Sequence, residues 1–386
     1  MLQDHSLKSL KNFNPNKVPI SLYIHLPWCE KRCPYCDFNI NTNKLDGDEE
    51  RLLVALNQDL KDSMKYIQKR KFCSIYFGGG TPSLVSSKII KKIIKNLKDM
   101  GLLKKECEIS FELNPKEVTY SYIDEIIAAG VNRISIGIQS FDQEVLGSLE
   151  RNHNANDSYQ AIKIASGFKN INISIDLIYG IMNQSINSLK QDIEIFCKNK
   201  IDHLSLYQLT IEPNTIFYKK ELNIPSDKTI ESMELAAKDI LNRNNIFQYE
   251  VSSWSKNNKV SKHNMNYWLY GDYLGIGPGA HSKITEKNSI ARMIKLKKVE
   301  SYINNPSKIK IIKIDDASYD LDLAMNVLRV KNGTSFKDLE KRGVYIPDTF
   351  KEKLFMGYKK GLIEKNLIKA TDQGYKFLND TVNNFN

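Results

Sequence analysis

The chain has 386 residues, of which 41% are hydrophobic and 26% charged. These values are ordinary for globular proteins and exclude a disordered or fibrous chain, and the length allows a barrel-sized domain with an appendage. The formal net charge of +11 is compatible with an anionic partner, but lysines are spread along the chain among Asn and Ile, so a compositional bias explains it equally well.

Hydrophobic residues are nowhere concentrated enough to suggest a membrane span or a signal peptide. The sequence contains no run of about 18 apolar residues, and its polar first 17 residues lack the apolar segment of a signal peptide. We therefore expect a cytoplasmic protein, in which disulfides are uncommon. Of the six cysteines, Cys73, Cys107 and Cys197 are scattered in apolar stretches, where we expect buried thiols.

From residue 20 onward, short β-rich runs alternate with longer amphipathic runs, which predicts repeated βα units and a parallel sheet. Six strands are predicted, at residues 20–26, 72–77, 107–113, 132–138, 171–179 and 203–210. The intervening segments 86–101, 121–130 and 155–167 are predicted to be helices, and each closes on a glycine, as helix C-termini often do. Six units fit a partial (βα)6 barrel better than a closed eight-unit barrel.

The second half of the chain continues with a different pattern. Residues 226–245 predict another helix, followed by a strand-like QYEVSSW and the glycine-rich GDYLGIGPGAHS. Residues 318–380 predict helices that end in a helix, hairpin and helix, an α+β arrangement resembling a winged helix. We divide the chain into an N-terminal extension (1–19), a partial barrel (20–225), a barrel-flanking segment (226–310) and a C-terminal domain (311–386).

Chemically unusual residues follow the predicted strands. Because the carboxyl ends of parallel strands share one rim, where such folds place their chemistry, these residues predict one composite site. They are the cysteine loop after the first strand, GGGTPS (78–83), Glu112, Gln139, Asp176 and Thr210.

Cys29, Cys33 and Cys36 follow the spacing C-x3-C-x2-C. Zinc is one candidate, because thiolates suit it and His25 could be a fourth ligand. A structural zinc loop, however, usually pairs two separated C-x2-C knuckles. An iron–sulfur cube takes one ligand per iron, so three thiolates leave one iron open to an exogenous ligand. The spacing therefore favours a [4Fe-4S] cluster over zinc.

The motifs resemble those of the radical S-adenosylmethionine superfamily, and more narrowly of the oxygen-independent coproporphyrinogen III oxidase family and its haem-chaperone branch, HemW. The resemblance runs from about Tyr23 through the C-terminal tail. It rests on SLYIHLPWCEKRCPYCDF, YFGGGTPSL, ELNP, VNRISIGIQSF, DLIYG, YQLTIEPNT and HNMNYW followed by GDYLGIGPGAH. It implies a radical SAM partial barrel, with a HemW-like domain at the C-terminus.

The resemblance also implies roles for individual residues. The three cysteines would ligate the cluster, the methionine end of S-adenosylmethionine would meet Tyr23, Gly79, Gly80 and Thr81, and the rest of it would meet Glu112, Gln139, Arg151 and Asp176. These types suit the task, since glycine permits close approach, arginine can fork onto a carboxylate and a carboxylate can accept ribose hydroxyls. Without the resemblance, GGGTP would be interpreted as a turn, Arg151 as a solvated cation and Asp176 as a cap at the end of a strand. Thr210 matches a position that is not always a hydroxyl residue in the family.

Two functions follow from this resemblance. A decarboxylase would use a 5′-deoxyadenosyl radical to remove hydrogen from a propionate of coproporphyrinogen III, in porphyrin metabolism, whereas a chaperone would bind haem and hand it to an acceptor protein. The decarboxylases carry a further cysteine two residues after the third, where this chain has Phe38, and a longer segment before the loop. We therefore expect a haem chaperone rather than an active coproporphyrinogen III dehydrogenase, with contact with the inner membrane left open.

HNMNYW (263–268) resembles a haem-binding motif of the chaperone branch. His263 supplies an imidazole suited to axial ligation, and Tyr267 with Trp268 would cover a porphyrin face. Met265 would be a second axial ligand if the segment were extended. A loop histidine among aromatic residues is otherwise structural, and among the remaining histidines we expect His281 as a secondary candidate and structural or surface roles for His5, His153 and His203.

A third hypothesis, nucleic-acid binding or modification, rests on the positive charge and the winged-helix-like tail. It would require Lys and Arg to cluster on one helix of the tail. KEKLFMGYKKGLIEKNLIK is basic but mixed with Glu, so we expect no nucleic-acid partner.

Overall fold

The computed structural model describes residues 14–199 and 201–386, so His5 lies outside the described residues. Six parallel strands follow one another across a single sheet in chain order, which confirms all six predicted strands. They are β1 (Ile20–Leu26), β2 (Phe72–Gly79), β3 (Leu103–Leu113), β4 (Arg133–Gln139), β5 (Asn172–Tyr179) and β6 (His203–Gln208).

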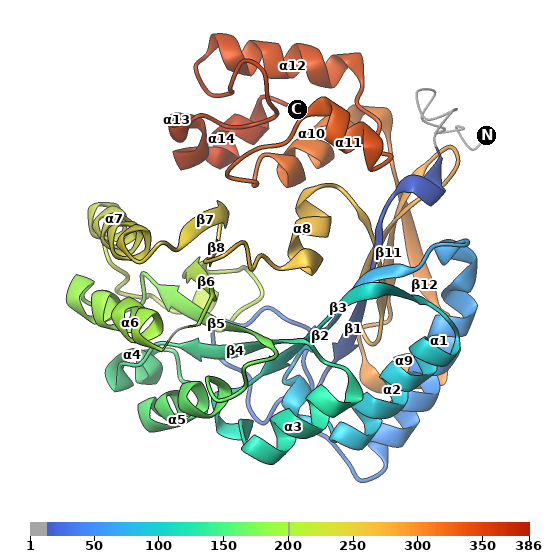
Figure 1. Ribbon diagram of the computed structural model, residues 1–386, viewed down its shortest axis with the longest axis vertical. Helices are drawn as coiled ribbons and strands as arrows, with labels where there is room; N and C mark the ends of the chain where they lie inside the picture. Colours follow the sequence, from blue (N-terminus) through green and yellow to red (C-terminus); the bar gives the residue numbers. More distant parts are fainter. Residues whose placement is uncertain (1–13, 200) are drawn as a thin grey trace.

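Helices cover the outer face of this curved sheet (Figure 1). They are α1 (Asp48–Ile67), α2 (Ser87–Asp99), α3 (Tyr120–Ala129), α4 (Gln143–Ser148), α5 (Ala155–Ala165), α6 (Ile186–Lys198) and α7 (Asp227–Arg243). In α2, Ile89, Ile90, Ile93 and Ile94 recur at helical spacing and are buried against the sheet. After α3, Gly130 takes a φ of 122°, a backbone conformation that favours glycine and ends the helix.

The parallel strands alternate between apolar and polar side chains. On β2, Ile75 and Phe77 belong to the main hydrophobic core between sheet and helices, whereas Tyr76 lines the barrel interior. On β3, Phe111 likewise enters the core and Glu112 the interior. Since successive side chains of a strand point to opposite faces, this alternation gives an apolar outer layer and a polar barrel lumen.

The sheet continues beyond the six parallel strands to a total of twelve. Its order is β12-β11-β10-β9-β1-β2-β3-β4-β5-β6-β8-β7, an open arrangement consistent with a partial barrel (Figure 1). The added elements are β7 (Phe247–Glu250), β8 (Ser253–Ser255), α8 (Lys262–Trp268), β9 (Asp272–Ile276), β10 (His281–Thr285), β11 (Ile290–Lys295), α9 (Val299–Asn304) and β12 (Ile309–Ile314). β9 pairs with β1 in parallel, and β10 to β12 follow as an antiparallel extension.

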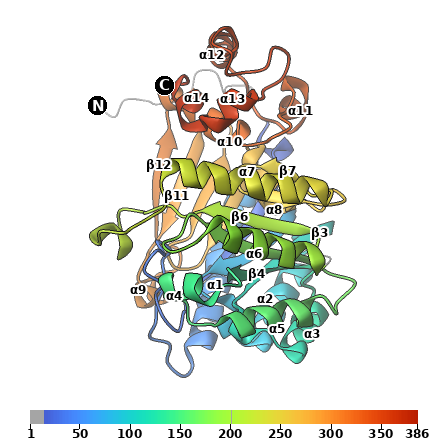
Figure 2. The ribbon, with the colours of Figure 1, turned by 90° about the vertical axis from the view of Figure 1, so that its left-hand side faces the viewer.

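The C-terminal residues form a helical unit stacked on one end of the barrel (Figure 2). It contains α10 (Asp316–Val327), α11 (Phe336–Lys341), α12 (Asp348–Lys359), α13 (Asp372–Lys376) and α14 (Leu378–Asn383). Between α12 and α13 a short hairpin is closed by the bridge from Ile363 to Ala370. The boundary that we expected at residue 310 falls inside β12. Within the described residues, no helix combines the length and the apolar character needed to cross a membrane.

Candidate cofactor site

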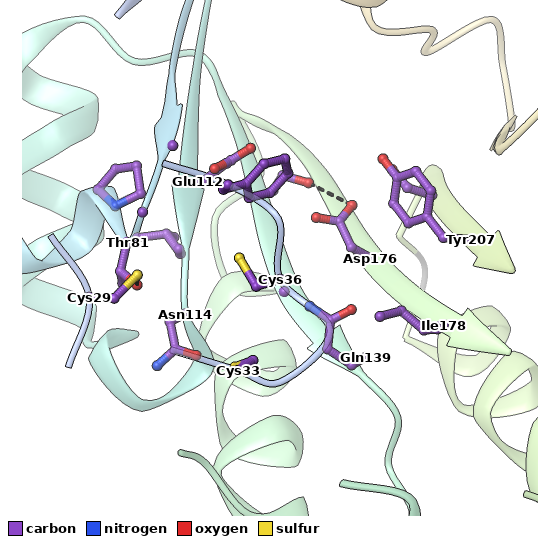
Figure 3. A pocket seen from close by; sticks show the side chains of 18 of the residues that line it. Cys29, Cys33, Cys36, Thr81, Glu112, Asn114, Gln139, Asp176, Ile178 and Tyr207 are labelled. Atoms are coloured by element: carbon purple, nitrogen blue, oxygen red, sulfur yellow. Dashed lines mark hydrogen bonds between the residues drawn. The ribbon is translucent and has the colours of Figure 1, made fainter. Parts of the chain in front are cut away.

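A cavity of about 420 Å³ opens at the carboxyl ends of the parallel strands. It brings together ten of the twelve residues predicted for the site: Cys29, Cys33, Cys36, Gly79, Gly80, Thr81, Glu112, Gln139, Arg151 and Asp176. Thr210 also lines it. The expectation that polar residues at the strand ends converge on one rim therefore agrees with the geometry (Figure 3).

The three cysteines lie on the loop after β1, all as half-buried free thiols. The loop is folded by its own backbone: Cys29 N–H donates to the Asn41 carbonyl at 3.0 Å and Cys36 N–H to the Cys33 carbonyl at 3.1 Å. Burial raises the pKa of the Cys29 thiol, and it raises the pKa of Cys36 to about 11. A cation at the site would therefore be needed to hold them as thiolates.

The thiols lie at separate points around the cavity (Figure 3). Within the described residues, no three His, Cys, Asp or Glu side chains converge as the ligands of one metal ion would. A tetrahedral zinc site requires such convergence, whereas a four-iron cube takes each thiolate on a different iron and spreads the ligands around a larger object. The donor set and its spacing in the cavity fit a cluster better than zinc.

Arg151 is a half-buried cation beside the cysteine loop. Its Nη1 donates to the Tyr35 hydroxyl at 3.1 Å and lies 3.5 Å from Cys33 Sγ, and its Nη2 donates to Asn114 Oδ1 at 2.9 Å. Its buried Nε has no hydrogen-bond partner. A buried donor without a partner is costly, so this guanidinium suits an anionic ligand that enters the cavity.

Glu112 and Asp176 supply two carboxyl groups to the inner wall. The Tyr76 hydroxyl donates to Glu112 Oε1 at 2.8 Å, and the Ser135 hydroxyl donates to Asp176 Oδ1 at 3.0 Å. Burial raises the pKa of Glu112 to about 7, with the charge of Asp176 adding to the effect, and burial raises the pKa of Asp176 to about 6. Both groups therefore titrate near neutrality and can accept or release a proton as a ligand binds.

Two backbone features shape the cavity. Gln139 has a φ of 66°, an uncommon conformation for a residue with a side chain, and it follows an irregularity in the pairing of β4 with β5. A Cβ on Gly79 would lie 2.6 Å from the His25 ring, and one on Gly80 would lie 2.6 Å from the Trp28 carbonyl oxygen. The glycines are thus required by close packing against the chain around β1, in addition to any role toward a ligand.

His263 lies outside this cavity, in the helix α8. Its Nε2 is 2.7 Å from the Tyr267 hydroxyl and its Nδ1 is 2.9 Å from the Ser74 hydroxyl. The ring is 2% exposed, and burial lowers its pKa to about 3. His263 is therefore a neutral imidazole with both nitrogens engaged, rather than a ligand presented on an open loop.

Two expectations for this motif were wrong because the segment is helical. Side chains two residues apart on a helix diverge by about 200°, so Met265 does not share a face with His263. Trp268 is directed to the C-terminal unit, where the Arg329 guanidinium lies 4.4 Å from the ring centre. Of the two aromatic residues in the motif, it is Tyr267 whose ring lies beside that of His263, at a centroid distance of 4.8 Å.

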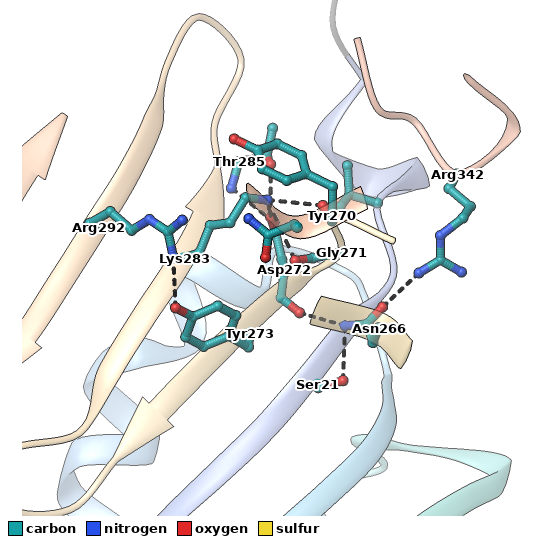
Figure 4. A network of polar contacts seen from close by, with 12 residues as sticks. Ser21, Asn266, Tyr270, Gly271, Asp272, Tyr273, Lys283, Thr285, Arg292 and Arg342 are labelled. Carbon is teal, nitrogen blue, oxygen red and sulfur yellow. Dashed lines mark hydrogen bonds and ion pairs between the residues drawn. The ribbon is translucent and has the colours of Figure 1, made fainter. Parts of the chain in front are cut away.

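Helix α8 is anchored by a polar network to both the sheet and the C-terminal unit (Figure 4). Asn266 donates to the Ser21 hydroxyl and to the Asp272 carbonyl, each at 2.9 Å, and it accepts from Arg342 at 2.9 Å. The Asp272 carboxylate is itself buried and paired with Arg70 at 2.6 Å and Lys283 at 3.2 Å. These contacts fix α8 at the amino end of the barrel.

Comparison with known proteins gives the relationships of the chain. Residues 23–196 match the model of the radical SAM superfamily. The chain is 36% identical to "Heme chaperone HemW" of Buchnera aphidicola subsp. Acyrthosiphon pisum over 95% of its own length and 98% of the relative's. This chain belongs to the HemW family. HemW of Escherichia coli is 39% identical over 69% of this chain and 71% of that protein.

Among solved structures, the coproporphyrinogen III oxidase HemN of Escherichia coli superposes with a TM-score of 0.80. It covers 97% of this chain and 92% of its own, at 21% identity. This likeness shows that the HemW-family chain has the radical SAM α/β fold, with a mixed sheet and surrounding helices, as the sequence predicted.

Not every residue predicted for a HemW-like site lies at the cavity. Tyr23 does not line it; its hydroxyl is 3.0 Å from His25 Nδ1 and its ring stacks on Tyr76. His281 is exposed on β10. His153 is buried, and its Nε2 lies 3.1 Å from the Ile138 carbonyl oxygen. Sequence reasoning missed several lining residues, which the inward parity of the strands could have identified: Tyr76, Ser110, Arg133, Ser135, Ser174, His203, Ser205 and Tyr207.

Proposed function

We propose that this protein is a haem chaperone that carries a [4Fe-4S] cluster with S-adenosylmethionine and transfers haem to an acceptor protein. One observation supports this most strongly: relatives named "Heme chaperone HemW" align with 95% of the chain at 36% and 37% identity. The similarity therefore includes the barrel, the α8 motif and the C-terminal unit, rather than the radical SAM region alone.

Cys29, Cys33 and Cys36 would hold the cluster, leaving one iron for the amino and carboxylate groups of S-adenosylmethionine. When bound, the cluster supplies the electron for reductive chemistry at the sulfonium. Arg151 would direct its unpartnered Nε to the carboxylate of the cofactor. Glu112 and Asp176 would accept hydrogen bonds from amino or ribose hydroxyl groups, and they adjust their protonation because their pKa values lie near 7 and 6.

For haem, His263 would be the ligand of the iron. Burial lowers the pKa of this imidazole to about 3, so it is neutral, the form that ligates iron. Because Tyr267 and Ser74 occupy its two nitrogens, ligation requires that α8 shift and that at least one of these hydrogen bonds break. Haem loading is therefore expected to be slow and coupled to movement of α8.

The alternative function is oxygen-independent decarboxylation of coproporphyrinogen III, which the shared HemN-like fold permits. Phe38 argues against it. The position that carries a further cysteine in the decarboxylases is here an aromatic side chain, 60% exposed at the cavity. The chain therefore lacks a thiol that the decarboxylase pattern includes.

The test begins with anaerobic reconstitution with iron and sulfide. We expect about four irons per chain and a reduced-state electron paramagnetic resonance signal that changes when S-adenosylmethionine is added. Cys33→Ser should abolish both. Cys197→Ser is the matched control, because Cys197 is a half-buried thiol on α6 that does not line the cavity. A reconstituted protein that contains zinc and no iron would contradict the cluster assignment.

The second part of the test separates chaperone from enzyme. Titration with haem should give one haem per chain with a Soret band that shifts on binding, and His263→Ala should remove that shift. Incubation of the reduced, loaded protein with coproporphyrinogen III should give no decarboxylated product. Product formed at a catalytic rate would replace the chaperone proposal with the enzyme.

A further inference from the structure

A second cavity, of about 410 Å³, lies at the other end of the barrel from the cysteines. It is lined by the start of β3, the residue before β4, the loop that leads into β5, and the segment before α8 with the first residue of that helix. Nine of its eleven lining residues are polar or charged. Such a lining excludes an apolar ring from its interior and favours a small, charged ligand group.

Four lysines converge on this second cavity from three separate stretches of chain: Lys105 on β3, Lys169 before β5, and Lys259 with Lys262 before and at the start of α8. All four are exposed. Among the described residues, no carboxylate forms an ion pair with any of them. We call this feature the lysine cavity.

The two acidic groups of the lysine cavity offset only part of the charge of its four lysines, and one of them, Glu108, interacts electrostatically with Lys262. Glu108 is buried, lies 3.5 Å from Arg133 and accepts the backbone N–H of His263 at 3.0 Å. Glu106 is the other carboxylate in the lining. Elsewhere the chain pairs its buried lysines, for example Lys283 with Asp272. With four lysines against two carboxylates, the lining keeps an excess of positive charge, which an anion bound among the lysines would neutralise.

We propose that the lysine cavity binds a small ligand carrying two or more carboxylate or phosphate groups. Lysine ammonium groups are compact point charges that bind such oxyanions without a fixed geometry. Two sources of this chemistry are compatible with the cavity: the paired propionates of haem, with the macrocycle outside, and a free phosphate compound. The first source rests on the proposed function, and the second does not.

The lysine cavity is separated from the cofactor cavity by a thin partition. Lys259 and Lys262 line the former, whereas Ser261 and Asn264 line the latter. Arg133 lines the cofactor cavity and donates to the Lys259 carbonyl at 3.1 Å and to the Val260 carbonyl at 3.3 Å. An anion on the lysines therefore acts on the same backbone that precedes His263 and forms part of the cofactor cavity wall.

The first experiment titrates the full chain with inorganic pyrophosphate by calorimetry at constant ionic strength. We expect one site, and in Lys259→Ala/Lys262→Ala a dissociation constant about tenfold higher, equivalent to about 1.4 kcal/mol. Lys310→Ala/Lys313→Ala is the matched control, because it removes the same charge from exposed positions on β12. Circular dichroism confirms folding, and Lys259→Gln/Lys262→Gln replaces the alanine variant if that variant does not fold.

The second experiment compares haem with haem dimethyl ester, in which both propionates are blocked. If haem propionates are the ligand, the Lys259/Lys262 variant should bind haem about tenfold more weakly, while its affinity for the ester should be unchanged. A loss confined to pyrophosphate assigns the cavity to a phosphate compound. The proposal would be overturned if wild type and the Lys259/Lys262 variant bound pyrophosphate equally well and also bound haem equally well. It would also be overturned if the β12 control lost as much affinity as that variant. A chain that binds pyrophosphate but no haem contradicts only the haem-chaperone function.

Discussion

The Nε2 atom of His263 lies 2.7 Å from the hydroxyl of Tyr267, one helical turn further along α8. If His263 ligates haem through Nε2, this hydrogen bond has to break first. Tyr267→Phe removes it and keeps the aromatic ring. We expect haem to bind about two- to tenfold more tightly, because a hydrogen bond contributes about 0.5–1.5 kcal/mol net. Absorbance titration with haem measures the change.

The matched control for this variant is Tyr122→Phe. The Tyr122 hydroxyl, on α3 and away from α8, donates a comparable hydrogen bond to the Val85 carbonyl at 2.8 Å. Its loss should leave haem affinity unchanged. If Tyr267→Phe also leaves the affinity unchanged while His263→Ala abolishes binding, the imidazole ligates through Nδ1 and Ser74→Ala becomes the informative variant.

A second prediction concerns the buried, unpartnered Nε of Arg151. Arg151→Lys keeps the positive charge near Cys33 but cannot present a planar fork to a carboxylate. We expect about tenfold or greater loss of S-adenosylmethionine affinity, since hydrogen bonds to charged groups contribute about 1.5–3 kcal/mol. Anaerobic calorimetry on the reconstituted protein measures it, with iron content as a check on cluster loading.

The control for Arg151→Lys is Arg292→Lys. Arg292 also donates to a tyrosine hydroxyl, that of Tyr273 at 2.8 Å, but it lies on β11, away from the cofactor cavity. Its replacement should leave S-adenosylmethionine affinity unchanged. Equal affinity in wild type and Arg151→Lys would remove Arg151 from the binding set.

Much of the fold could be predicted from local pattern. The strand at 20–26 was predicted with the bounds that it has in the structure, because Ile and Leu alternate there with Ser, Tyr and His, and Pro27 follows. The rim of the cofactor cavity was predictable for a related reason: the βα repeat alone places the ends of parallel strands together. Residues such as Glu112 and Asp176 could therefore be assigned to one cavity without knowing any tertiary contact.

The remaining features depend on long-range packing that a local pattern does not contain. β10 to β12 extend the sheet because β9 pairs with β1, about 250 residues earlier in the chain. HNMNYW is too short to show the hydrophobic periodicity of a helix. Its helix depends instead on the N-cap Ser261 and on the hydrogen bonds of Asn266 with Ser21 and Arg342. Burial of His263 follows from these contacts and was not predictable.

A third prediction uses the strained backbone at Gln139, whose φ is 66°. Glycine adopts this conformation without a steric penalty. Gln139→Gly should therefore leave the free energy of unfolding unchanged or raise it by up to about 1 kcal/mol, while S-adenosylmethionine affinity falls because an amide in the cavity is lost. Urea unfolding and anaerobic calorimetry measure the two effects separately.

Gln208→Gly provides the comparison, because Gln208 also lines the cofactor cavity but ends β6 with an ordinary strand backbone. This glycine should lower the free energy of unfolding by about 0.5–1 kcal/mol. If both variants are destabilised equally, the conformation of Gln139 stores no strain, and its positive φ has no bearing on binding.

The last prediction concerns pH and the buried His153. Burial, with the charge of Arg151 adding to it, lowers the pKa of His153 to about 4, while its contact with the Ile138 carbonyl acts in the opposite direction. An unfolded histidine has a pKa of about 6.5. Between these values the unfolded chain binds more protons than the folded one, so the free energy of unfolding falls as the pH drops from about 6.5 to 4.

His153→Gln removes this titration. The pH dependence of the free energy of unfolding between pH 6 and 4.5 should become shallower than in wild type by up to about 1.4 kcal/mol per pH unit, the contribution of one proton. His281→Gln, at an exposed position on β10, should change it less. Urea unfolding at several pH values measures each slope. Parallel curves for wild type and His153→Gln would mean that His153 binds its proton equally well in the folded and the unfolded chain, in conflict with the lowered pKa expected from its buried position beside Arg151.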